Sequence, residues 1–181
     1  MREAVWILTL LLVGAYGARA QSLEEQMARN EQAVSEVLPE ATSFVAEHGI
    51  YEHIRGYRDT GDGSEPELVG YVFFTKDIGA RWRGYIGSIP ILVGLDLKGR
   101  LTGVHILKHF EPYGYRSINL PEYAAQFEGK SVLDPFKVYE DVDGYSGATI
   151  SVAAATRTIR HAARSMAREF LVKKSKPGGR E

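Results

Sequence analysis

The chain has 181 residues, 44% of them apolar and 25% charged, which is enough to build one ordinary globular core. It contains no cysteine, and this excludes disulfides, thiolate-bound zinc, iron–sulfur clusters and a cysteine nucleophile. Lysine and arginine number 22 against 23 acidic residues, so the formal charge of −1 argues against a nucleic-acid-binding protein.

The first twenty residues carry the pattern of an export signal. The apolar stretch from Ala4 to Ala15 is followed by Ala18-Arg19-Ala20, the small-x-small pattern at which signal peptides are cleaved. This stretch is shorter than the ~20 apolar residues that a membrane-spanning helix needs. We therefore expect residues 1–20 to be a signal peptide and the mature chain to be periplasmic or secreted. An uncleaved N-terminal membrane anchor is the alternative.

The first half of the mature chain indicates a helix followed by strands. Ser22 and Glu25 have the spacing of a capping box. The helix that they open should end before Pro39, because the residue before a proline is pushed out of the helical region. Apolar and β-branched runs then predict strands, with turns at 60–66 and 98–100 closing two hairpins. The predicted strands are Thr42–Ala46, Tyr51–Arg58, Leu68–Thr75, Ile89–Leu97 and Leu101–His109.

The second half indicates two helices and one further strand. Leu120–Phe127 has a short helical pattern, and Phe136–Tyr139 is predicted as a strand. Ile150–Val172 is predicted as a long helix, because its apolar residues recur at three- and four-residue intervals. Its other face carries four arginines, which fit a solvated surface or a docking surface for an acidic partner: Arg157, Arg160, Arg164 and Arg168.

Together these elements predict an α+β domain, in which an antiparallel sheet of hairpins is accompanied by an N-terminal helix and a long C-terminal helix. We expect the domain to occupy residues 21–172. Residues 173–181, which include Pro177-Gly178-Gly179, are expected to form a polar tail.

The most informative segment, Asp143-Gly144-Tyr145-Ser146-Gly147-Ala148-Thr149, lies directly before the long helix. The first N–H groups of a helix have no intrahelical partner, and together with the helix dipole they attract phosphate. A hydroxyl at this position, from Ser146 or Thr149, could bond to a phosphate or be esterified by one. The alternative is an ordinary helix cap.

Two other chemistries fit this sequence poorly. Gly144-Tyr145-Ser146-Gly147-Ala148 nearly forms a G-x-S-x-G nucleophile elbow, but no aspartate follows Ser146, so the order of a serine hydrolase triad fails. His105 and His109 have the spacing of a helical metal site. They lie on a predicted strand, where they would be ~13 Å apart. No metal site is therefore predicted.

Asp143-x-x-Ser146-Gly147-Ala148-Thr149 resembles the flavinylation motif of the FMN-binding domain family. That family occurs in the Rnf and sodium-pumping NADH:quinone reductase complexes and in NosR-type accessory proteins. A second stretch is also similar to the family, from Gly84-Tyr85-Ile86-Gly87 through 92–96 and 99–104 to His109-Phe110-Glu111-Pro112. Its last four residues favour the NosR-type branch.

The resemblance implies that FMN is the cofactor and that Thr149 is its covalent attachment point, through a phosphoester. A flavin transferase would install it from FAD with magnesium. The transferase would read Asp143, Ser146, Gly147 and Ala148, which would also shape the phosphate loop. Tyr145 and Ser151 are further candidates for cofactor contacts.

The resemblance also implies a setting for the flavin ring. Gly84 and Gly87 would let the backbone approach the ring, with Tyr85 and Ile86 lining it and His109 and Glu111 at the pocket rim. The implied function is an electron carrier with membrane or periplasmic redox partners, rather than a turnover enzyme. A non-redox module on the same fold, binding a ligand or a protein, is the alternative.

Overall fold

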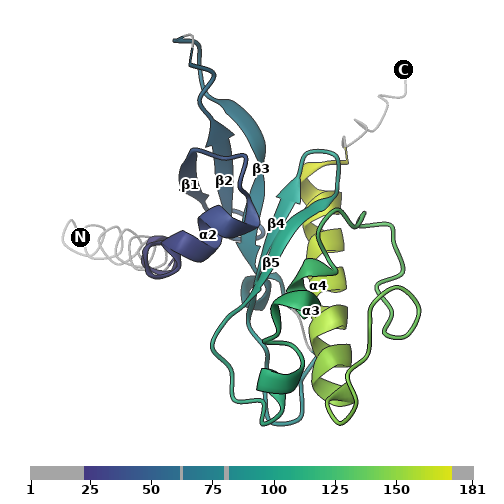
Figure 1. Ribbon diagram of the computed structural model, residues 1–181. Coiled ribbons are helices and arrows are strands. Elements are labelled where there is room, and N and C mark those ends of the chain that lie inside the picture. The colour runs from purple at the N-terminus through teal and green to yellow at the C-terminus, as the bar shows by residue number, and fades with distance from the viewer. Residues whose placement is uncertain (1–22, 62, 80–81, 173–181) are drawn as a thin grey trace, which may run out of the picture.

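The computed structural model describes residues 23–61, 63–79 and 82–172. Its centre is a five-stranded antiparallel sheet in the order β1-β2-β3-β4-β5, so that each strand pairs with its neighbour in the chain (Figure 1). The strands are β1 Ser43–Glu47, β2 His53–Arg58, β3 Glu67–Phe74, β4 Ile91–Asp96 and β5 Leu101–Ile106. The helices are α2 Glu31–Val37, α3 Pro121–Ala125 and α4 Thr149–Phe170, with short 3-10 helices η1 Thr75–Ile78 and η2 Gly114–Arg116. The predicted α+β class and both predicted hairpins are confirmed.

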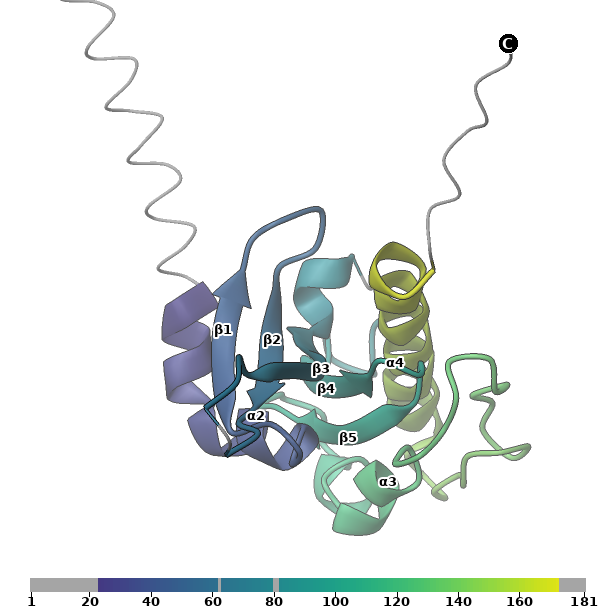
Figure 2. The ribbon, with the colours of Figure 1, turned by 90° about the horizontal axis from the view of Figure 1, so that it is seen from above.

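Helices α2 and α4 cover opposite faces of the sheet (Figure 2). Because successive side chains of a strand point to opposite faces, one strand supplies both cores. In β3, Tyr71 and Phe73 pack on the α4 side, whereas Val72 and Phe74 pack on the α2 side. The continuous apolar run of β3 therefore reflects a strand that is buried on both faces.

The end of α2 lies in direct contact with the backbone of β4 and β5. A Cβ atom added at Gly94 would overlap the carbonyl oxygen of Val37, and one added at Gly103 would lie 2.8 Å from the Cα of Val37. The hydroxyl of Thr102 donates to the same Val37 carbonyl at 2.5 Å. These strand glycines thus make room for the helix, and the threonine satisfies a carbonyl at the end of α2, where no intrahelical donor is available.

Helix α4 packs its predicted apolar stripe on the sheet, because Val152, Ala155 and Ile159 are all fully buried. Two of the arginines on the helix donate hydrogen bonds to the loop at residues 132–135. Arg164 donates to the carbonyls of Val132 and Asp134, both at 2.8 Å, and Arg160 donates to the carbonyl of Pro135 at 3.2 Å. This arginine face is therefore partly an attachment surface for the 132–135 loop.

The predicted strand Phe136–Tyr139 is wrong. Phe136 and Tyr139 have positive φ angles of 49° and 69°, and the segment makes only an isolated bridge between Val138 and Val142. The carboxylate of Asp141 accepts the N–H groups of Phe136 and Lys137, at 3.0 and 2.6 Å. A local side-chain acceptor has thus replaced the strand partner that these N–H groups would need.

The predicted N-terminal helix ends before Pro39, but it is not continuous. Residues 23–29 are helical, a turn follows at Asn30, and α2 then begins at Glu31. The Asn30 side chain donates to the Gln26 carbonyl at 2.7 Å, a local bond of the kind that competes with helix propagation. The predicted signal peptide and polar tail lie outside the described residues.

In residues 23–172, apart from the undescribed positions 62, 80 and 81, none of the helices has the length and apolarity needed to span a membrane.

Candidate functional site

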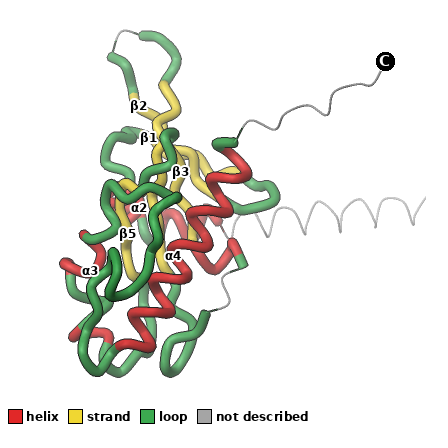
Figure 3. Tube along the Cα trace, turned by 90° about the vertical axis from the view of Figure 1, so that its right-hand side faces the viewer, coloured by secondary structure: helices red, strands yellow, loops and turns green. Residues whose placement is uncertain are grey.

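Helix α4 begins at Thr149, at the end of the molecule where several loops gather (Figure 3). Ala148 is the N-cap residue and has no side-chain oxygen, so no side chain caps the first turn. Gly147 precedes it with a φ of 78°, a conformation that suits glycine. Thr149 itself is exposed. The helix therefore presents an exposed hydroxyl beside first-turn N–H groups that no side chain caps.

The loop before Thr149 is fixed by contacts with neighbouring segments. The backbone N–H of Asp143 donates to the Gln126 side chain at 2.6 Å, and the Tyr145 ring packs edge-on against the buried Tyr123. The hydroxyls of Tyr139 and Thr149 lie 3.5 Å apart. The Tyr139 ring also occupies the space that a side chain at residue 144 would need, so glycine is required there.

A second loop, residues 84–87, is joined to the start of α4 through Glu111. The Glu111 carboxylate accepts the N–H groups of Tyr85, Ile86 and Gly87, at 2.7, 2.9 and 3.2 Å. It also accepts the hydroxyl of Ser151, which lies in the first turn of α4. Three segments that are distant in the sequence therefore meet at this one side chain.

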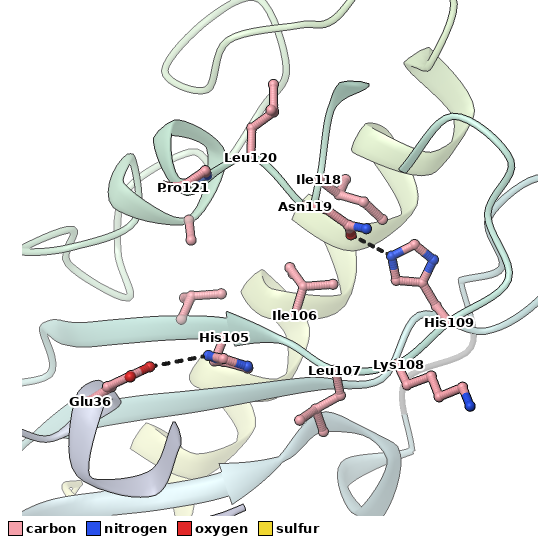
Figure 4. A pocket seen from close by; sticks show the side chains of 12 residues that line it. Glu36, His105, Ile106, Leu107, Lys108, His109, Ile118, Asn119, Leu120 and Pro121 are labelled. Atoms are coloured by element: carbon pink, nitrogen blue, oxygen red, sulfur yellow. Dashed lines mark hydrogen bonds and ion pairs between the residues drawn. The ribbon is translucent and has the colours of Figure 1, made fainter. Parts of the chain in front are cut away.

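His109 supports Glu111 from the other side. Its Nδ1 accepts the backbone N–H of Glu111 at 3.0 Å, so the ring proton lies on Nε2, which donates to the Asn119 side chain at 2.5 Å. His109 also lies at the rim of a pocket of about 600 Å³ along β5 (Figure 4). His105 in the same pocket pairs with Glu36 instead, at 3.5 Å. The two histidines thus engage different partners.

Exposed apolar side chains surround this junction. Tyr85 and Ile86 belong to the loop held by Glu111, Phe110 precedes Glu111 in the chain, and Ile150 lies between Thr149 and Ser151. Their exposed fractions are 69% for Tyr85, 53% for Ile86, 78% for Phe110 and 56% for Ile150. Large apolar side chains that are exposed next to one junction are candidates for a binding surface.

These features fit FMN. An exposed hydroxyl and first-turn N–H groups without a side-chain cap suit its phosphate, and exposed aromatic and aliphatic side chains suit a flat ring. Fold and site therefore fit a small α+β domain that holds a phosphorylated aromatic cofactor.

Comparison with known proteins shows what the chain is similar to. Residues 84–164 match the model of the FMN-binding domain. The chain is 34% identical over 110 residues to a subunit of the ion-translocating oxidoreductase complex from Pseudomonas aeruginosa, covering 54% of this chain and 51% of that protein. For the corresponding protein of Vibrio atlanticus the identity is 32% over 89 residues, covering 44% and 43%. For that of Vibrio vulnificus it is 22% over 169 residues, covering 84% and 79%.

Over residues 84–164 the chain is thus similar to the FMN-binding domain family, and the match supports the family and the cofactor, FMN, that the motifs predicted. It spans about half the length of the first two of these relatives.

The predicted site residues fall into three groups in the structure. Residues 143–149 form the loop and first residue of α4, whereas Gly84–Gly87, Glu111 and Ser151 form the junction described above. His109 lies behind Glu111 and faces the pocket along β5. Their roles toward FMN stay predictions.

Three supporting residues have no counterpart among the sequence predictions: Gln126, Tyr139 and Asn119. A glycine five positions away in the chain is the sequence signal for the placement of the Tyr139 and His109 rings. A Cβ atom at Gly144 would overlap the Tyr139 ring, and one at Gly114 would overlap the His109 ring. No spacing in the sequence indicates the contacts of Gln126 and Asn119, which come from other segments.

Proposed function

We propose that this chain is an exported electron-transfer protein that carries FMN on Thr149 through a phosphoester. The observation that carries the proposal is the position of the Thr149 hydroxyl: it is exposed, on the first residue of α4, and preceded by the Asp143-x-x-Ser146-Gly147-Ala148 pattern. A tether of this kind suits an exported protein, because a lost cofactor is not easily replaced outside the cytoplasm.

The attachment chemistry balances with FAD as the donor. The Thr149 hydroxyl loses its proton, its oxygen forms a bond to the phosphorus of the FMN portion, and the pyrophosphate bond of FAD breaks so that AMP leaves. A magnesium-dependent flavin transferase is the proposed partner for this step. Because Thr149 is exposed and its loop projects at the end of the molecule, such an enzyme can reach the hydroxyl.

Once bound, FMN supplies reversible redox chemistry, and the protein supplies its surroundings. The start of α4 would hold the phosphate through first-turn N–H groups, with Asp143, Tyr145 and Ser146 in the preceding loop. The exposed side chains of Tyr85 and Ile86 would give the ring an apolar surface. The described part of the chain contains no group of side chains suited to hold a metal ion, and the proposed carrier needs none.

The proposed redox partners are membrane or periplasmic proteins, since the matched relatives are subunits of an ion-translocating oxidoreductase complex. We place the domain at residues 21–172 and the signal peptide at residues 1–20. The finer assignment to the NosR-type branch rests on His109-Phe110-Glu111-Pro112, whereas the matched relatives are named for the ion-translocating complex. The genes adjacent to this one distinguish the two branches.

The test is to co-express the exported protein with a flavin transferase, and to measure flavin fluorescence on a denaturing gel together with intact mass. We expect wild type to gain one FMN less one water and Thr149→Val to gain nothing. Ser146→Ala is the matched control, because it removes an exposed hydroxyl from the same loop and should keep the flavin. A bare wild-type polypeptide would overturn the proposal, as would a Thr149→Val variant that stays fluorescent.

A further inference from the structure

Glu111 is a buried carboxylate in an exposed part of the molecule. Its residue is 7% exposed, although Phe110 and Pro112 on either side are exposed. An ionised carboxylate is buried at a cost unless donors surround it. The four donors at Tyr85, Ile86, Gly87 and Ser151 supply that environment, and we call this arrangement the Glu111 clamp.

The clamp uses the whole acceptor capacity of the side chain. A carboxylate has two oxygens with about four lone-pair sites, and four donors point to them. Burial alone would raise the pKa of Glu111, but the Ser151 hydroxyl and the three backbone N–H groups outweigh it and hold the pKa below its ordinary value. The ionised form therefore belongs to the folded state, and no lone pair is left for a cofactor.

The surrounding residues are arranged around this carboxylate. A Cβ atom at residue 84 would lie 2.5 Å from the Glu111 carboxyl carbon, so Gly84 makes room for Glu111. On the opposite side, His109 accepts the Glu111 N–H and is itself held by Asn119. By contrast, a Cβ atom at Gly87 would meet nothing within 4 Å, so that side of the loop is open.

We propose that Glu111 is a positioning residue whose carboxylate holds the 84–87 loop against the first turn of α4, and thereby sets Tyr85 and Ile86 relative to Thr149. The inference goes beyond a contact at the pocket rim, because the carboxylate acts through the loop and not on the flavin. It rests on the proposed function, since the loop positions a flavin ring only when FMN is attached at Thr149.

The first arm of the test needs no flavin. It measures amide hydrogen exchange at residues 85–87 in full-length protein made without a flavin transferase. Glu111→Gln keeps the shape but offers an NH₂ group to backbone donors, so exchange at these amides should speed up by about tenfold or more. Ser151→Ala removes one donor and should give a smaller increase, which Ser151→Thr should reverse. Glu65→Gln, on the exposed hairpin between β2 and β3, is the matched control and should change nothing.

The second arm uses protein matured with a flavin transferase. We expect Glu111→Gln to receive FMN on Thr149 but to show a shifted flavin absorption spectrum and faster fluorescence depolarisation, because the ring surroundings have loosened. The amide proton resonances of residues 85–87 should titrate together with the Glu111 carboxylate in wild type and not in Glu111→Gln. His109 accepts the backbone N–H of Glu111 and makes no hydrogen bond to its carboxylate.

The outcomes separate the two proposals. A bare wild-type polypeptide defeats the phosphoester, while the exchange arm still decides whether the Glu111 clamp exists. Unchanged exchange at 85–87 in Glu111→Gln defeats the clamp, whereas changed exchange with an unaltered flavin spectrum and depolarisation defeats the positioning role of Glu111. If Glu111→Gln does not fold, the Ser151→Ala and Ser151→Thr pair gives the same decision.

Discussion

The contact of α2 with the sheet and the start of α4 both depend on glycine, but in opposite ways. Under α2, Gly94 and Gly103 remove side chains so that a helix end can lie on the strands. At the α4 start, Gly144 leaves room for an exposed tyrosine, and Gly87 faces open space. The first region is closed by backbone contact, whereas in the second the side of the loop at Gly87 stays open. The difference teaches that glycine in this chain marks either a packed contact or a surface for binding, and that only the surroundings distinguish them.

The largest expected effect on the free energy of unfolding is at the contact between the end of α2 and β4. Gly94→Ala places a Cβ atom onto the Val37 carbonyl, and should cost about 3 kcal/mol of unfolding free energy by overpacking. Urea denaturation measures the loss. The folded fraction should still accept FMN on Thr149, because the altered contact belongs to α2. A variant as stable as wild type would show that the α2 contact is looser than described.

The second prediction concerns the loop at residues 136–141, which precedes the Asp143–Thr149 segment. Asp141 accepts the N–H groups of Phe136 and Lys137 and pairs with Lys130 at 3.2 Å, so Asp141→Asn should cost about 2 kcal/mol. Burial opposes ionisation, but these bonds hold the pKa of Asp141 below its ordinary 3.8. This stabilisation is therefore present above pH 3.8 and is lost as the pH falls through the lowered pKa. Denaturation of wild type and variant at about pH 7 and about pH 3 should show the difference shrinking in acid.

The third prediction concerns His53, which lies in the packed part of the molecule beside the rings of Tyr71 and Phe170. Burial lowers the pKa of His53, so the unfolded chain takes up a proton below pH 6.5 more readily than the folded one. Stability should fall as the pH drops below 6.5, with a slope of at most about 1.4 kcal/mol per pH unit from this group. His53→Phe should remove this part of the slope, and a slope that is unchanged would contradict the assignment.

The smallest effect on stability is expected at Gly87, on the open side of the 84–87 loop. A Cβ atom at residue 87 meets nothing within 4 Å, so Gly87→Ala should change the unfolding free energy by less than about 0.5 kcal/mol. It should nevertheless alter the absorption spectrum of flavin on Thr149, since the added methyl group points to the open side of the loop. Gly94→Ala is the contrasting variant, with a large loss of stability and an unaltered spectrum.

Much of the fold could be predicted because its signals are local. The hairpin turn at Gly99 and the three- and four-residue apolar period of α4 need only neighbouring residues, and both are seen in the structure. Phe136–Tyr139 failed for the opposite reason. Its apolar residues resemble a strand, but Asp141 takes up the N–H groups that a strand partner would need.

The candidate site shows the same limit. The Asp143–Thr149 motif pointed to the start of α4, because motif and helix adjoin in the chain. The burial of Glu111 depends on donors that lie 24 to 40 positions away in the chain. The sequence also could not tell which group lies against Gly84. A close approach of the flavin ring and a close approach of the Glu111 carboxylate both require glycine there.

The chain order of the strands has a consequence for maturation. From β2 on, each strand pairs with the strand that precedes it in the chain, so the sheet forms from local pairings at a low cost in loop-closure entropy. Helix α4 is the last described element. Its first turn supplies Ser151 to the junction, whose other parts, the 84–87 loop and Glu111, come at least 40 positions earlier in the chain. A nascent polypeptide therefore lacks the assembled junction until α4 has docked, so the flavin transferase that we propose would, if it recognises this junction, modify only molecules in which α4 is in place.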